Sequence, residues 1–127
     1  MTRWSSKKII EWYSEQEWLI GSNFLPSTAI NQLEMFQGET FDEKTIRKEL
    51  GLAKSLGFNS MRVYLHDLLW EIKDEFLINF EKFLSICEEN NIKPIIVLFD
   101  DCHRANPKLG AQYLPVKGIH NSFYRKI

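Results

Sequence analysis

The amino-acid sequence predicts an α/β fold, a single domain over residues 1–127 in which about three parallel strands alternate with flanking helices. Strand-like segments lie near residues 18–24, 59–65 and 94–100, and segments of helical periodicity separate them. This alternation is typical of right-handed βαβ units, which place their strands in parallel. Polar residues follow the end of each predicted strand, at the sheet edge where parallel α/β folds bind ligands.

The composition excludes several classes of protein. Hydrophobic residues make up 44% of the chain, which is enough for one core and argues against disorder. There are 16 basic and 17 acidic residues, a balance that argues against a nucleic-acid partner. No apolar run reaches the roughly 18 residues of a membrane span. The polar start lacks the apolar region of a secretory signal, so we expect a cytoplasmic protein, with a matured secreted chain as the alternative.

The first third of the chain predicts a helix, a strand and a long connection. Ser6 to Tyr13 has an apolar side and follows a capping serine, Ser5 or Ser6. A strand is expected from Trp18 to Phe24, with Gly21 at its middle. The stretch from Leu25 to Glu39 predicts an irregular loop, and loops of that length are usually functional or disordered.

The middle of the chain predicts a helix and a strand with one buried side. The helix begins near Thr40 to Asp42, where Thr40 and Glu43 have capping-box spacing and Asp42 is a competing cap. Its apolar residues recur at three- and four-residue steps, and Gly57 ends it. In the following strand Met61, Val63 and Leu65 alternate with Arg62, Tyr64 and His66.

The last predicted helix and strand are more apolar. A helix from about Asp74 to Glu89 carries an apolar stripe that ends at Cys87, which predicts a buried, reduced thiol there. The continuous apolar run from Ile95 to Phe99 is typical of a parallel strand covered on both faces. Cys87 and Cys102 are too few for a disulfide framework.

Two architectures fit three such strands. A doubly wound sheet often carries a glycine-rich phosphate loop after its first strand, but Pro26-Ser27-Thr28 occupies that place. A (β/α)8 TIM barrel needs no such loop. A complete barrel takes roughly 250 residues, so this chain would supply a partial barrel of about three strands.

Several segments resemble the opening of cellulase-like bacterial glycoside hydrolases, which are similar to the family-five glycosidases. The segments span nearly the whole chain: residues 21–37, 39–42, 56–63, 65–70, 97–102 and 120–122. Together they are specific, whereas each alone is weak. The chain departs from the family at His103, where Trp is expected, and over residues 123–127.

The resemblance implies a TIM barrel that hydrolyses β-linked polysaccharide with retention and without a cofactor. Such enzymes carry the acid/base Glu after strand four and the nucleophilic Glu after strand seven, with the two carboxyl groups roughly 5–5.5 Å apart. This sequence supplies neither strand, so no catalytic residue is assigned. We expect the isolated chain to be inactive or nearly so.

The resemblance also implies a set of carbohydrate-contacting residues. Arg62 is the foremost candidate, because the Arg at the end of strand two in similar glycosidases holds the nucleophilic Glu ionised. A structural role is the alternative for each candidate, for example Glu34 satisfying backbone N–H groups in its loop or Asp67 capping a short turn. The candidates are Asn23, Glu34, Arg62, Tyr64, His66, Asp67, Trp70, Asp100, Asp101, His120 and Asn121.

Two other functions compete with carbohydrate binding. The open edges of three strands invite pairing, so the chain could be an assembly module that forms a homo-oligomer or complements a partner carrying the rest of the barrel. A metal-dependent hydrolase is the weaker alternative, because the spacing of Asp100, Asp101, Cys102 and His103 matches no zinc signature and no metal ligand is assigned.

Overall fold

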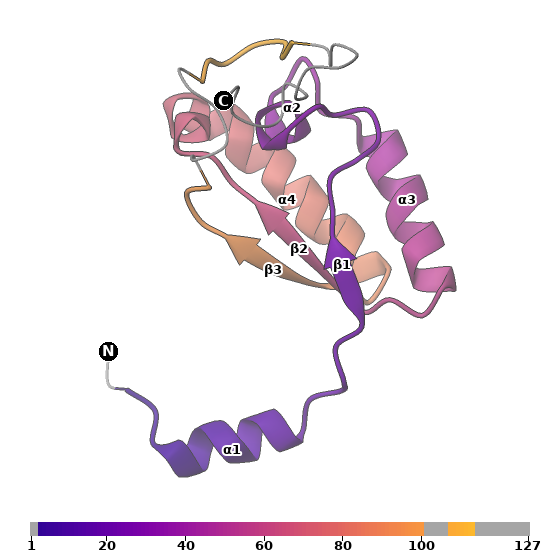
Figure 1. Cartoon of the computed structure of the whole chain (residues 1–127), viewed down its shortest axis with the longest axis vertical. Helices are drawn as coiled ribbons and strands as arrows, with labels where there is room; N and C mark the ends of the chain where they lie inside the picture. The colour runs from indigo at the N-terminus through magenta and orange to yellow at the C-terminus, as the bar shows by residue number, and fades with distance from the viewer. Residues whose placement is uncertain (1–2, 101–106, 114–127) are drawn as a thin grey trace, which may run out of the picture.

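A computed structural model describes residues 3–100 and 107–113, and it has the predicted α/β class (Figure 1). Three parallel strands form one sheet in the order β1-β2-β3. The strands are β1 (Gly21–Asn23), β2 (Ser60–Tyr64) and β3 (Lys93–Val97). The helices are α1 (Ser6–Ser14), α2 (Gln32–Phe36), α3 (Glu43–Ser55), η1 (Asp67–Ile72, a 3-10 helix) and α4 (Lys73–Glu89).

Two strands are shorter than predicted because β2 limits their pairing. β1 pairs with β2 only from Gly21 to Asn23, so residues 18–20 lie outside the ladder. β3 starts opposite Ser60 and ends at Val97, opposite the last residue of β2. The predictions of strands over residues 18–24 and 94–100 were therefore wrong at their ends.

The helices other than α1 cover one face of the sheet, and this face carries the core (Figure 1). Met61 and Val63 point from β2 into that core, as their alternation predicts. Phe36 of α2 lies at its centre and makes edge-to-face contacts with three rings of α4. Such pairs add to the stability that burial alone provides. The α4 rings in contact with Phe36 are those of Phe76, Phe80 and Phe83.

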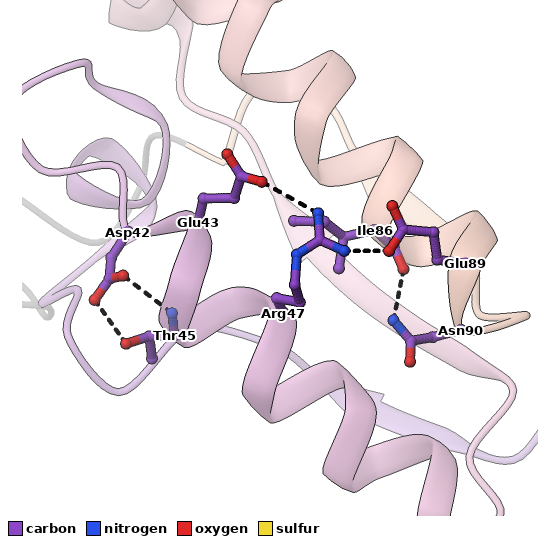
Figure 2. Close-up of polar contacts among 7 residues, drawn as sticks. All are labelled: Asp42, Glu43, Thr45, Arg47, Ile86, Glu89 and Asn90. Atoms are coloured by element: carbon purple, nitrogen blue, oxygen red, sulfur yellow. Dashed lines mark hydrogen bonds and ion pairs between the residues drawn. The ribbon is translucent and has the colours of Figure 1, made fainter.

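Side chains cap the beginning of α3 and the end of α4 (Figure 2). Asp42 caps α3, since its carboxylate accepts hydrogen bonds from the backbone N–H of Thr45 at 3.0 Å and from its hydroxyl at 2.6 Å. The competing cap named from the sequence is thus the one that forms. Asn90 ends α4 by donating from Nδ2 to the carbonyl of Ile86 at 2.8 Å.

An ion-pair bridge joins the outer surfaces of the same two helices (Figure 2). The guanidinium of Arg47 on α3 pairs with Glu43 of its own helix at 3.1 Å and with Glu89 of α4. All three side chains are about half exposed, so the bridge contributes little to stability compared with the aromatic core.

One local prediction was wrong, and one structural alternative differs from the structure. The stretch predicted to be irregular contains α2, because Asn31 caps it by accepting from the N–H groups of Leu33 and Glu34. The turn after β2 is capped by His66, whose Nδ1 accepts from the N–H of Leu68 at 3.2 Å, and not by Asp67.

The second face of the sheet has no helix over it in the described part of the chain (Figure 1). The register places one set of side chains there, which we call the open face: Asn23, Ser60, Arg62, Tyr64, Lys93, Ile95 and Val97. Ile95 is 48% exposed, so the prediction of a third strand covered on both faces was wrong. The apolar run reflects one buried side and one uncovered side.

The N-terminal segment stands away from this two-layer unit (Figure 1). We call residues 4–20 the arm; it comprises α1 and the extended chain that leads to β1. α1 has no buried residue. Across the ranges 3–100 and 107–113, no helix combines the length and the apolar character that crossing a membrane requires.

Candidate functional site

The structure sorts the predicted site residues into three groups around the carboxyl ends of the strands. Asn23, Arg62 and Tyr64 lie together on the open face. His66, Asp67 and Trp70 line a pocket beyond the end of β2. Glu34 and Asp100 have backbone contacts in the loops, whereas Asp101, His120 and Asn121 lie outside the described residues.

The open-face group is organised around one amide oxygen. Oδ1 of Asn23 accepts hydrogen bonds from Nε of Arg62 at 2.8 Å and from the hydroxyl of Tyr64 at 3.2 Å. The guanidinium carbon of Arg62 also lies 5.2 Å from the centre of the Tyr64 ring, within the range of a cation–π contact. These contacts fix the three side chains relative to one another before any ligand binds.

Arg62 has a cationic group without a carboxylate partner in the described ranges. None of the ion pairs formed by residues 3–100 and 107–113 includes it. Its Nε is used by Asn23, and its guanidinium borders a groove of about 270 Å³ between β1 and β3. A guanidinium can donate five hydrogen bonds, so Arg62 has donor capacity for an acidic or hydroxylated group on this face.

His66 and Asp67 form the polar side of the pocket. The imidazole of His66 is buried, and its Nδ1 lies 2.7 Å from Oδ1 of Asp67. The same nitrogen faces the N–H of Leu68, so the cap of η1 and the carboxylate contact share one atom. The side chain of Asp67 is 58% exposed and therefore reaches solvent at the pocket rim.

The pocket itself is mostly apolar and has a volume of about 360 Å³. Trp70 and Phe99 are 63% and 69% exposed, so two aromatic rings present surface at its mouth. Phe99 was not among the predicted site residues, because the apolar run placed it in the third strand. Phe99 has a φ of 59°, in the left-handed region that bulky residues rarely adopt, and such strained residues cluster at ligand sites. The remaining lining residues are Leu65, Leu69, Phe76 and Leu98.

Glu34 has the contacts of a scaffold residue. It is 6% exposed, and its two carboxylate oxygens accept from the backbone N–H groups of Ile30 and Gln112, each at 2.7 Å. Gln37 makes a similar reciprocal pair with the backbone of Gly110. The loop before α2 is thereby tied to residues 107–113. This geometry matches the structural alternative for Glu34.

Asp100 is held through its backbone. Its N–H donates to the carbonyl of Leu65 at 2.8 Å, and its carbonyl accepts from Nε2 of Gln32 at 2.7 Å. The next candidate, Asp101, lies outside the described residues, as do Cys102 and His103. Among the residues that are described, no cluster of three or more His, Cys, Asp or Glu side chains has the geometry of a metal site.

Comparisons of the whole chain with known families, with curated proteins and with solved structures found no match.

Proposed function

We propose that this chain is a carbohydrate-binding α/β unit that takes a β-linked glycan at the carboxyl end of its sheet and does not cleave it. The observation that carries the proposal is the pocket with Trp70 and Phe99 at its mouth and Asp67 at its rim. A sugar ring has an apolar face and a polar edge. The aromatic rings suit the apolar face, and the carboxylate suits the hydroxyl groups of the edge.

The polar and apolar parts of the pocket have separate tasks in this proposal. An aromatic ring at the mouth stacks on the apolar face of a pyranose. The carboxylate of Asp67 accepts hydrogen bonds from sugar hydroxyls, and a carboxylate can accept several at once. The volume of about 360 Å³ is within the range of small-molecule sites.

The sheet supports a barrel-like origin for this unit. Its strands follow one another in sequence order, and α3 and α4 cover the same face, as in successive units of a (β/α)8 barrel. A barrel also has a strand face that helices do not cover, which matches the open face. The described residues contain three strands, so they include neither position that carries a catalytic Glu in the glycosidases that the sequence resembles.

The proposal is tested by titrating the labelled chain with cellohexaose and with xylohexaose while backbone amide shifts are recorded. We expect saturable shifts at Asp67, Trp70 and Phe99 for at least one sugar. Trp70→Ala should weaken binding about three- to tenfold through loss of the ring surface. Trp18→Ala, which removes an exposed ring outside the pocket, is the matched control and should bind like wild type.

Two outcomes contradict the proposal in different ways. If neither sugar shifts the pocket amides at millimolar concentration, the pocket does not bind these β-glycans. If reducing ends accumulate when the pure chain is incubated with either sugar, binding without cleavage is wrong and a catalytic pair must be present.

A further inference from the structure

We propose that the chain forms a two-fold dimer in which the arm of each copy packs on the open face of the other. The observations behind this inference are the direction of the arm, the composition of its helix, and the charge and area of the two surfaces. It does not depend on the carbohydrate proposal, because the pocket residues belong to neither surface.

The helix of the arm is amphipathic, and none of its residues is buried by the described part of the chain. Ile9, Ile10, Trp12 and Tyr13 lie on one side of α1, and each is between 47% and 67% exposed. A helix of nine residues is too short to be stable alone in water, and amphipathic helices gain most of their stability from packing. α1 therefore needs an apolar surface to cover.

Asn59 directs the arm away from the sheet to which it is attached. Its Nδ2 donates to the carbonyl of Trp18 at 2.9 Å, and its Oδ1 accepts from the N–H of Ile20 at 2.7 Å. The carbonyl of Ile20 accepts from the backbone of Asn59 at 2.9 Å. Gln16 of the arm also accepts a hydrogen bond from Nζ of Lys93 of the same chain, at 3.4 Å. The helix α1 itself stands away from the strands (Figure 1), so it is placed to reach another molecule.

The open face is the kind of surface that is normally covered. Parallel sheets occur almost only with both faces covered. Ile95 is 48% exposed at the centre of β3, and it lines the groove of about 270 Å³ on this face. The amphipathic helix α1 of a second copy is a helix that could cover this face.

The charges of the two surfaces are complementary. The charged side chains that the register places on the open face are Arg62 and Lys93, both cationic. The arm has two acidic residues at its carboxyl end, Glu15 and Glu17, whereas Glu11 pairs with Lys7 within α1. An arm laid with this end over β2 and β3 brings carboxylates to a face that offers only cations.

The area is sufficient for a stable dimer. Aromatic side chains present roughly 150–250 Å² each, so the four rings of the arm, each about half or more exposed, offer roughly 400 Å². The aliphatic residues of the arm and the covered part of the face add a comparable area. Two reciprocal contacts thus reach the roughly 1,600 Å² of a standard interface.

The test is sedimentation velocity of the full chain between 1 and about 200 µM, a span that covers ordinary dimer affinities. We expect a concentration-dependent dimer. Trp12→Glu on the arm and Lys93→Glu on the open face should each weaken it by about tenfold or more. Leu52→Glu is the matched control, since Leu52 is 55% exposed on α3, outside both surfaces, and should leave the dimer unchanged.

A charge swap separates the proposed contact from nonspecific association. Glu15→Lys combined with Lys93→Glu should recover dimerisation relative to Lys93→Glu alone, because the arm then carries a cation at the end that lies over the new carboxylate of the open face. A wild-type chain that stays monomeric throughout the range would overturn the proposal. So would an oligomer that Trp12→Glu leaves unchanged, or one that Leu52→Glu weakens equally.

Discussion

Nε of Arg62 donates a hydrogen bond to Oδ1 of Asn23 at 2.8 Å, across the boundary between the two strands that carry them. The bond lies on the open face, where no helix of the described chain covers it. Arg62 is the residue that the resemblance placed first in a carbohydrate site. In the structure, Arg62 is hydrogen bonded to Asn23 of β1 and lies on the open face, the surface proposed for the arm of a second copy.

Arg62→Ala should therefore affect the proposed dimer contact and leave the proposed carbohydrate pocket intact. We expect it to leave the affinity for a β-glycan within about twofold of wild type, because the pocket of Trp70 is lined by other residues. It should weaken the dimer, because the open face loses one of its two cations. Amide-shift titration and sedimentation of the same samples measure both effects. If Arg62→Ala abolishes sugar binding and leaves the oligomeric state unchanged, Arg62 belongs to the carbohydrate site and not to the dimer contact.

Glu34→Gln should destabilise the loop clamp between α2 and residues 107–113. The amide keeps one acceptor oxygen but turns an NH2 donor toward the N–H of Ile30 or Gln112, and leaving such a buried donor unsatisfied costs about 1–3 kcal/mol. Urea unfolding followed by circular dichroism measures the loss. Glu39→Gln, at an exposed position of the same loop, should leave the midpoint unchanged. Equal midpoints for the two variants would contradict the clamp.

Gly21 and Gly51 form a matched pair of tests for how closely β1 approaches β2. A Cβ at Gly21 would lie 1.9 Å from the carbonyl oxygen of Ser60, so Gly21→Ala must displace a strand. A Cβ at Gly51 would meet only Oδ1 of Asn90, at 3.9 Å, in the middle of α3. We expect Gly21→Ala to lower the free energy of unfolding by more than about 2 kcal/mol, with Gly51→Ala raising it by about 0.5–1 kcal/mol. A tolerated Gly21→Ala would show that the register of β1 is wrong.

The parts of the fold that local chemistry specifies were predictable from the sequence. The alternation around Met61 and Val63 predicts which side of β2 is buried, and the structure buries both residues. Gly57 ends the region of α3 with a φ of 88°, the backbone conformation for which glycine is favoured. Asp42 was one of two caps that the spacing allowed. In each case a few neighbouring residues contain the whole signal.

The parts that depend on distant contacts were not predictable. α2 has only five residues and is buried along its whole length, so its sequence shows no amphipathic period, and only Asn31 marked its start. The role of Glu34 depends on Gln112, which is 78 positions away. The pocket depends on Phe99, and the left-handed backbone conformation of this residue cannot be predicted from its type. A continuous apolar run does not distinguish a strand that is buried on both faces from a strand with one exposed face.

The cap of α3 should give a small part of the stability a defined pH dependence. Hydrogen bonds from the side chain and the backbone N–H of Thr45 lower the pKa of Asp42 below its ordinary value of 3.8. The carboxylate therefore stabilises the folded state above the unfolded pKa, and this contribution is lost as the pH falls through the lowered folded value. Asp42→Asn keeps a capping oxygen but cannot titrate. The urea midpoint of wild type should therefore fall relative to that of Asp42→Asn between pH 6 and about pH 3. A constant difference over that range would exclude the cap as a titrating group.

Cys87 should report the opening of the core through its reactivity. The thiol is 1% exposed on α4, and burial raises its pKa to about 12. At pH 8 the folded chain then holds roughly a thousandfold less thiolate at this position than an unfolded chain, and the thiolate is the species that reacts with alkylating reagents. In a Cys102→Ser background, iodoacetamide should label Cys87 slowly in buffer and rapidly in urea. A control chain with Ser55→Cys, Cys87→Ser and Cys102→Ser carries one exposed thiol on α3 and should be labelled rapidly in both. If Cys87 in buffer reacts as fast as this control, the packing of α4 against the sheet is not the one described.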